Sequence, residues 1–301
     1  MVYMKRIFLF LITNILVMIT LNFAISVIAS ILKIPLHPGS YGGLLLFCAV
    51  FGTGGAFISL FLSKIMAKWA MGVKIIDPTQ ASPQMRDLVY LVHRLAKKAD
   101  LPQMPEVGFY ESPEINAFAT GPSKSNSLVA VSTGLLDRMT PEEVEGVLGH
   151  EVAHIANGDM VTMTLIQGIV NAFTMFLARI LSSIISSQVE DKNRYTVQFA
   201  LTMLFDIVFT ILGSLVVNYF SRQREFRADK GSAKVTSKQH MIAALRKLQV
   251  VHDKPWNQEG DPKPAFASLK ISSSNGKSWL RLFSTHPSLE DRIQRLQESS
   301  F

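Results

Sequence analysis

Residues Thr140–His154 read TPEEVEGVLGHEVAH, and the local signals in this stretch predict a helix. Thr140 is a residue type that caps helix N-termini, Pro141 suits the first helical position, and Glu143 completes a capping box. Apolar residues recur through the stretch at helical spacing. Gly158 follows closely and readily takes the left-handed conformation that ends a helix. We therefore expect a helix that begins after Thr140 and ends near Gly158.

Two histidines on this helix are spaced for metal binding. His150 and His154 are four residues apart, so both imidazoles project from one face. Glu151 follows the first histidine, where its carboxylate can reach a water molecule beside a metal without being a ligand. This is the His-Glu-x-x-His pattern of zinc metalloproteases, in which the glutamate is the general base. The alternative is a pair of unrelated surface histidines.

A catalytic metal site of this kind needs a third protein ligand and an open position for water. The best candidates lie in SRQREFRAD, residues 221–229. Glu225 and Asp229 are four residues apart, so one helical face presents both carboxylates. One can bind the metal while the other accepts a hydrogen bond from the far nitrogen of a ligating histidine. Alternatively, the two acids are counterions for the surrounding arginines.

Four apolar blocks indicate an integral membrane protein. Each is longer than the ~20 residues that cross the hydrocarbon core as a helix, and the first is too long for a signal peptide. We expect two helical hairpins from these blocks, at about Ile7–Leu32, Gly42–Ser63, Val161–Val189 and Thr196–Phe220. The third and fourth contain Arg179 and Asp206, which either pair at similar depth or indicate a partly embedded hairpin.

The charge distribution predicts the orientation. The chain has a net charge of +7, and its Lys and Arg residues crowd the ends of the apolar blocks. The positive-inside rule then places both termini and residues 67–160 in the cytoplasm. The same placement argues against a nucleic-acid partner, because no recognition module accompanies the basic residues. With Cys48 as the single cysteine, no intramolecular disulfide is possible.

The remaining segments have ordinary globular character. A helix is expected over Pro83–Ala99 and another over Ser237–Val250, with a final helix from near Pro287. Residues 252–279 are rich in Pro, Ser, Asn and Lys and predict a mobile loop. Short strands are expected at Glu106–Tyr110, Ile115–Thr120 and Leu128–Ser132, with a polar turn at Gly121–Asn126.

These elements define the expected fold class: a mainly α membrane protein with a small β element. Four hydrophobic helices in two hairpins would accompany a cytosolic zincin-like domain. We expect a transmembrane hairpin, a catalytic part with the histidine helix, a second hydrophobic hairpin and a catalytic part with the third ligand, over residues 1–66, 67–160, 161–220 and 221–301.

The two motif segments, His-Glu-x-x-His and Arg-Glu-x-x-Ala-Asp, together resemble the HtpX-type heat-shock membrane metalloproteases. These are relatives of the CAAX prenyl endopeptidases and, more distantly, of the thermolysin-like gluzincins. The resemblance covers nearly the whole chain. It implies one Zn²⁺ per chain, with His150, His154 and Glu225 as ligands and Glu151 as general base. Asp229 would orient a ligating histidine, by analogy His150.

Two shorter matches imply substrate contacts. Residues 114–119 resemble the family's edge strand, on which Asn116 would contact the peptide backbone by strand addition. The alternative is an ordinary hairpin. The Thr-His-Pro sequence at 285–287, with Arg292 further on, resembles a carboxy-terminal His-Pro element. His286 would then approach the active site and help to stabilise the oxyanion, or it is a helix-capping histidine.

The expected protein is a multi-pass zinc endopeptidase of the bacterial inner membrane, with membrane-protein substrates and the bilayer as partners. Quality control of damaged or misfolded membrane proteins under stress is a role implied by the resemblance. Because His154 and Glu225 lie close to apolar blocks, the metal is expected on the order of 10 Å from the membrane surface. Self-cleavage is expected, if anywhere, in the 252–279 loop. The alternatives are a processing protease for CAAX-like peptides and a non-catalytic metal-binding scaffold.

Overall fold

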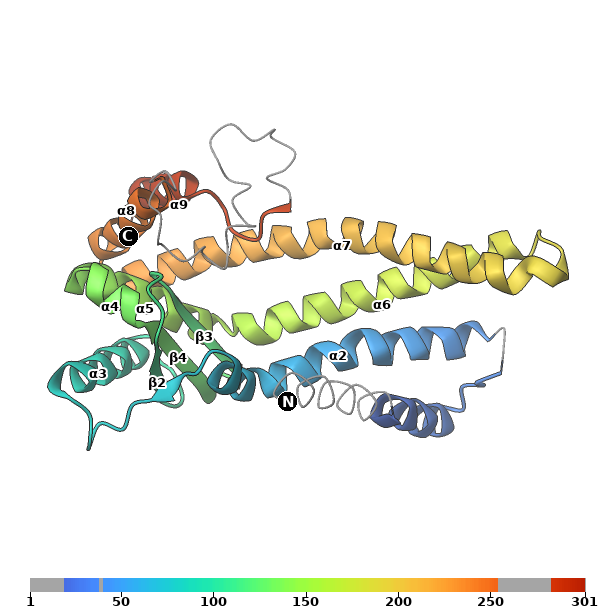
Figure 1. The fold of residues 1–301 in the computed structure, drawn as a ribbon, viewed down its shortest axis with the longest axis horizontal. Coiled ribbons are helices and arrows are strands. Elements are labelled where there is room, and N and C mark those ends of the chain that lie inside the picture. Colours follow the sequence, from blue (N-terminus) through green and yellow to red (C-terminus); the bar gives the residue numbers. More distant parts are fainter. Residues whose placement is uncertain (1–18, 38–39, 254–282, 301) are drawn as a thin grey trace, which may run out of the picture. The chain divides into compact units, whose positions relative to one another are not determined.

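The computed structural model describes residues 19–37, 40–253 and 283–300 and is mainly helical (Figure 1). The elements follow in the order α2 (Tyr41–Ala70), β1 (Lys74–Ile75), α3 (Pro83–Lys98), β2 (Glu106–Tyr110), β3 (Ala117–Ser123), β4 (Asn126–Ser132), α4 (Thr133–Arg138), α5 (Pro141–Asn157), α6 (Asp159–Ser186), α7 (Asp191–Val235), α8 (Lys238–Asp253) and α9 (Leu289–Glu298).

The chain divides into two compact units. The first, called here the apolar unit, comprises Met1–Ser59 and Thr164–Val217. The second, the sheet unit, comprises Leu60–Met163 and Asn218–Phe301. From residue 254 onward, the loop predicted at 252–279 lies outside the described residues. The expected self-cleavage there stays a prediction, as does the four-part division of the chain.

Three described helices, α2, α6 and α7, are long and apolar enough to cross a membrane, with 30, 28 and 45 residues. They confirm helices at the second, third and fourth apolar blocks. The first predicted block is described only from Ile19, as a shorter apolar helix Ile19–Leu32, and its remainder lies outside the described residues. The expected count of four spans therefore stays a prediction.

Inside the apolar unit, small and charged residues bring the helices together. A Cβ atom on Gly52 would collide with the backbone of Ala172, so α2 and α6 approach each other at that glycine. Arg179 Nη1 lies 3.9 Å from Asp206 Oδ1, which joins α6 to α7. The Arg179 guanidinium also lies 5.4 Å from the centre of the Phe47 ring on α2. The two ionisable residues thus face one another.

The sheet unit is built on a four-stranded sheet in the order β1-β2-β4-β3. Strands β2 and β4 are parallel, whereas the β1–β2 and β3–β4 pairs are antiparallel. The turn predicted at Gly121–Asn126 is too long, because β3 continues to Ser123 and β4 begins at Asn126. Gly121, at φ +145°, permits the irregularity that keeps β3 paired past Thr120. The short strand β1 was not predicted.

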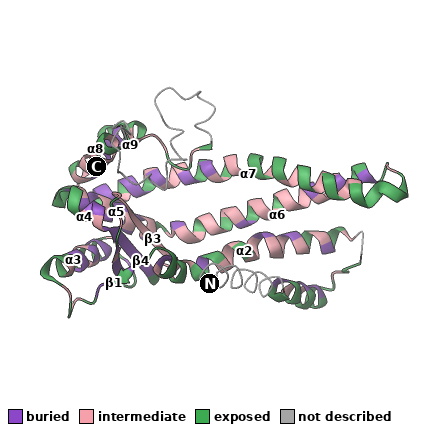
Figure 2. Cartoon of the chain, viewed as in Figure 1, coloured by how far each residue is buried: buried purple, intermediate pink, exposed green. Residues whose placement is uncertain are grey.

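The core of the sheet unit lies around α5, as the buried residues in Figure 2 show. Leu148, Val152 and Ile155 of α5 are fully buried, and they belong to the same hydrophobic cluster as residues of α3, β2 and β4. On another side, α8 contacts α5 so closely that a Cβ on Gly146 would lie 2.5 Å from the His240 carbonyl oxygen. This packing fixes α5, the helix that carries both histidines, on several sides.

Candidate metal centre

Helix α5 begins and ends where the sequence predicts. The capping box is present: the Thr140 hydroxyl accepts from the Glu143 amide, and the Glu143 carboxylate accepts from the Thr140 amide at 2.9 Å. Gly158, at φ 69°, ends the helix in the left-handed conformation. The two histidines lie in the last two turns, so the helical backbone of α5 directs both side chains to one face.

His150, His154 and Glu225 bring three ligand atoms within 4.8 Å of one another. The two histidine Nε2 atoms are 3.0 Å apart. The Glu225 carboxylate oxygens lie 3.4 Å from His150 Nε2 and 3.5 Å from His154 Nε2. Ligands at about 2.0–2.1 Å from a tetrahedral metal are separated by roughly 3.3 Å, so the three distances match the edges of such a site.

The outer nitrogen of each histidine contacts a buried carboxylate. His150 Nδ1 is 2.9 Å from Asp229 Oδ1, and His154 Nδ1 is 2.7 Å from Asp159 Oδ2. When each Nδ1–H donates to its carboxylate, the two Nε2 atoms present lone pairs toward the same point. Lone pairs at 3.0 Å repel unless a cation or a proton lies between them. The donor set therefore fits a divalent metal ion.

Each of these two carboxylates is in turn held by an arginine. Arg292 of α9 donates to Asp229 from Nε at 2.8 Å and from Nη2 at 2.6 Å. Its side chain is only 8% exposed, and Nη1 lies 3.6 Å from a Glu225 oxygen. Arg227 of α7 donates to Asp159 at 3.2 Å. The centre is thus built from α5, the first residue of α6, α7 and α9.

The contacts shift the pKa of several groups in the centre. Burial alone would lower the pKa of His150, but hydrogen bonding to Asp229 and Glu225 raises it to about 9. Burial would raise the pKa of the Glu225 carboxyl, but the histidines around it hold that pKa well below its usual range. For Asp229, burial is likewise outweighed by the hydrogen bonds from Arg292 and His150, which lower the pKa. The carboxylates are therefore ionised and able to bind a cation.

The other predicted site residues differ in their distance from this cluster. Glu151 is half-buried on α5, and its carboxylate makes no hydrogen bond or ion pair with any residue that the structure describes. His286 Nδ1 is 3.0 Å from a Glu225 oxygen, while the ring stays 58% exposed. Asn116 immediately precedes the edge strand β3, and its backbone amide and carbonyl bond to Ser132 of β4. Among the described residues, no hydrogen bond or ion pair joins Asn116 to the cluster.

The roles of Asp159 and Arg292 were not predicted. Asp159 lies directly after the glycine that ends α5, where an acidic residue looks like an ordinary helix-start residue. For Arg292 the sequence does contain a signal, because this residue occupies the apolar face of α9 between Leu289, Ile293 and Leu296. A charged residue in the middle of an apolar face is expected to have a buried partner.

The buried histidine–carboxylate cluster and the helices long enough to cross a membrane fit a membrane-bound metalloprotease, and comparison with known proteins identifies the chain as one. The chain belongs to peptidase family M48, whose model matches residues 82–300. It is 50% identical over 300 residues to a protein named Protease HtpX homolog from Bacillus licheniformis, covering 97% of this chain and 99% of the relative. Identity to the homolog from Bacillus subtilis is 51%, with the same coverage. Protease HtpX from Tolumonas auensis is 46% identical, over 98% of this chain and 99% of the relative.

A solved structure shows that the fold extends to more distant proteins. The crystal structure of S. mikatae Ste24p matches with a TM-score of 0.59 at 18% sequence identity. The match covers 95% of this chain but 65% of that chain. At this identity, the likeness concerns the fold alone.

Proposed function

We propose that this protein is a zinc-dependent endopeptidase that hydrolyses peptide bonds of membrane proteins, including damaged or misfolded ones. The observation that carries the proposal is the geometry of His150, His154 and Glu225. Two imidazoles and one carboxylate are the ligand set of catalytic zinc sites that keep an open position. A closed structural site would use four protein ligands, often including cysteine, and Cys48 belongs to the apolar unit.

In this proposal, Asp229 and Asp159 each hold one histidine in the tautomer that presents Nε2 to the metal. A bound zinc ion would supply Lewis-acid polarisation of the attacking water and the scissile carbonyl. Glu151 would accept a proton from that water and pass it to the leaving amine. Its carboxylate is suited to this because it lies beside a ligand and forms no hydrogen bond or ion pair with a described residue.

Substrate binding is proposed at the edge of the sheet. Strand β3 is last in the strand order, so its outer edge has no neighbouring strand within the described part of the sheet. An extended peptide could add to this edge, with Asn116 at the start of the strand contacting its backbone. His286, exposed and beside Glu225, would donate a hydrogen bond to the oxyanion that develops on the scissile carbonyl.

The site would work at the cytoplasmic surface of a bacterial inner membrane. Glu225 follows Phe220 by five residues in the continuous helix α7, which corresponds to roughly 8 Å along the helix axis. Peptide segments next to a membrane span are therefore the natural substrates. The positive-inside pattern supports placing both termini in the cytoplasm.

The test compares zinc-loaded wild type with Glu151→Gln in detergent, with casein and a membrane protein as substrates. Glu142→Gln is the matched control, because Glu142 lies on the same helix but is exposed. We expect wild type and the control to cleave, and Glu151→Gln to bind zinc normally but lose cleavage. If all three proteins bind zinc and none cleaves either substrate, a non-catalytic metal site becomes the better interpretation.

A further inference from the structure

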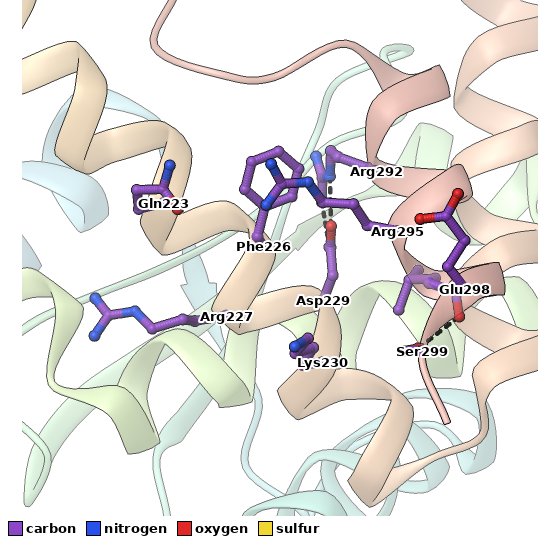
Figure 3. A pocket seen from close by; sticks show the side chains of 10 residues that line it. Gln223, Phe226, Arg227, Asp229, Lys230, Arg292, Arg295, Glu298 and Ser299 are labelled. Atoms are coloured by element: carbon purple, nitrogen blue, oxygen red, sulfur yellow. Dashed lines mark hydrogen bonds and ion pairs between the residues drawn. The ribbon is translucent and has the colours of Figure 1, made fainter. Parts of the chain in front are cut away.

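A pocket of about 400 Å³ in the sheet unit lies beside the metal centre, with walls from α7 and from α9 and the residues after it (Figure 3). Asp229 and Arg292 both line the pocket, and a dashed line in the figure marks the hydrogen bond between them. The wall has more basic than acidic side chains: Arg227, Lys230, Arg292 and Arg295 against Asp229 and Glu298. Because Asp229 is already neutralised by Arg292, the pocket keeps a surplus of positive charge.

Two of these basic groups are available to a ligand. Lys230 is exposed, and in the part of the chain that the structure describes its ammonium group forms no ion pair. The Arg295 guanidinium lies 3.8 Å from the centre of the Phe226 ring and has no carboxylate partner among the described residues. Stacking fixes the plane of the guanidinium and leaves its N–H edges free to bind an anion. Arg227 adds a third charge, which it shares with Asp159.

This arrangement favours a phosphate group as the ligand. Arginine binds phosphate oxygens with two parallel N–H donors, and lysine adds a point charge. The volume falls in the range of small-molecule sites, so a phosphodiester with its attached glycerol would fit better than a bare ion.

The place of the pocket along α7 identifies the source of the phosphate. Tyr219 and Phe220 end the apolar run with exposed side chains. Gln223 and Lys230 of the pocket lie roughly 5 and 15 Å further along the helix axis. The headgroup layer extends about 5–8 Å beyond the hydrocarbon core, and long basic side chains reach back toward it. Along α7, the pocket therefore begins within the depth of the phospholipid headgroups and extends beyond it, so that Lys230 meets a phosphate by reaching back toward the membrane.

We propose that this pocket binds the phosphate of an anionic phospholipid, and that the bound headgroup holds α9 against α7. The second part rests on the proposed function, because it concerns the metal centre. Arg292 extends from α9 to hold Asp229, which in turn contacts His150. A headgroup that bridges Lys230 and Arg295 keeps α9 in the position that this contact requires.

The binding test measures thermal unfolding of the full-length protein in detergent at constant ionic strength. Short-chain phosphatidylglycerol, phosphatidylcholine and inorganic phosphate are added at equal concentration. The pocket variant is Lys230→Gln with Arg295→Gln, and Arg86→Gln with Lys97→Gln removes the same charge from exposed positions on α3. We expect phosphatidylglycerol alone to stabilise wild type and the control, and the pocket variant to need at least about tenfold more of it.

Two outcomes would overturn this binding assignment. If the pocket variant responds to phosphatidylglycerol as the control does, the site is not in this pocket. If inorganic phosphate stabilises wild type as strongly as phosphatidylglycerol does, the pocket is a free-anion site and the lipid assignment is wrong.

The coupling to the metal centre is tested by the rate at which a chelator removes zinc. Phosphatidylglycerol should slow zinc loss from wild type and from the control but not from the pocket variant. Equal rates with and without the lipid would overturn the coupling. Neither readout measures proteolysis, so failure here is distinguishable from failure of the proposed catalytic roles.

Discussion

The buried pair of Arg292 and Asp229 gives the sharpest test of how the centre is held together. Replacing Arg292 by methionine keeps much of the length and packing of the side chain while it removes both hydrogen bonds to Asp229. Asp229 is 2% exposed, so its carboxylate would keep His150 as its remaining partner. The change therefore leaves a buried charge only partly compensated.

The expected cost follows from this environment. Removing one partner of a buried ion pair typically destabilises a protein by about 3–5 kcal/mol. Because His150 still contacts Asp229, we expect the lower end, about 3 kcal/mol. For a unit of this size, that corresponds to a fall in the melting temperature of roughly 6–12 °C. Zinc affinity should fall by about tenfold, the lower end for partners of metal ligands, because Arg292 acts through Asp229.

The assay combines thermal unfolding in detergent with zinc competition against a chelator. Arg246→Met is the control, because Arg246 is an exposed arginine on α8. The double variant Arg292→Met with Asp229→Leu removes both charges, so stability should recover while zinc affinity stays low. If Arg292→Met melts like the control and binds zinc normally, the structural role assigned to this arginine is refuted.

Three further changes test other parts of the structure. Asp159→Asn should weaken zinc binding by about 10–100-fold without abolishing it, measured by chelator competition; unchanged affinity would contradict its role at His154. Burial raises the pKa of the Tyr110 phenol to about 12, against opposing contacts from Asn116 and Ser132. The tyrosine of the unfolded chain therefore ionises first, and the stability of the fold should fall as pH rises from 10.0 toward about 12. Tyr110→Phe should flatten this decline in a denaturation series, and an unchanged slope would argue against it. Gly146→Ala would place a methyl group against the His240 carbonyl and should cost about 1–3 kcal/mol in thermal unfolding despite a better helix propensity; a gain would show that α5 and α8 separate freely.

The parts of the fold that were predictable are those encoded locally. One example is α5, whose start and end are both signalled by nearby residues. The capping box of Thr140 and Glu143 marks its start, the left-handed Gly158 marks its end, and the helix in the structure has these bounds. The apolar blocks were equally predictable, because a helix that crosses a bilayer needs about 20 predominantly apolar residues in a row. For His150 and His154, helical spacing alone predicts a shared face.

The parts that were missed depend on long-range contacts. Arg292 is 63 residues from Asp229 and 142 from His150 in sequence, so no local pattern links them. Strand β1 has two residues and exists through its pairing with Phe109 and Gly108 of β2. Its own composition carries too little signal to predict a strand.

The charges of the centre explain how it can fold before a metal arrives. Glu225 and Asp229 carry negative charge, and Arg292 balances one of them. The raised pKa of His150, about 9, supplies the second positive charge in the metal-free protein at neutral pH. A group whose folded pKa lies above its unfolded value stabilises the fold most fully below pH 6.5, and this contribution is lost as pH rises through about 9. In the metal-free protein, the proton on His150 thus takes the place of the metal cation. The two carboxylates, the arginine and the protonated histidine together carry no net charge until zinc displaces this proton.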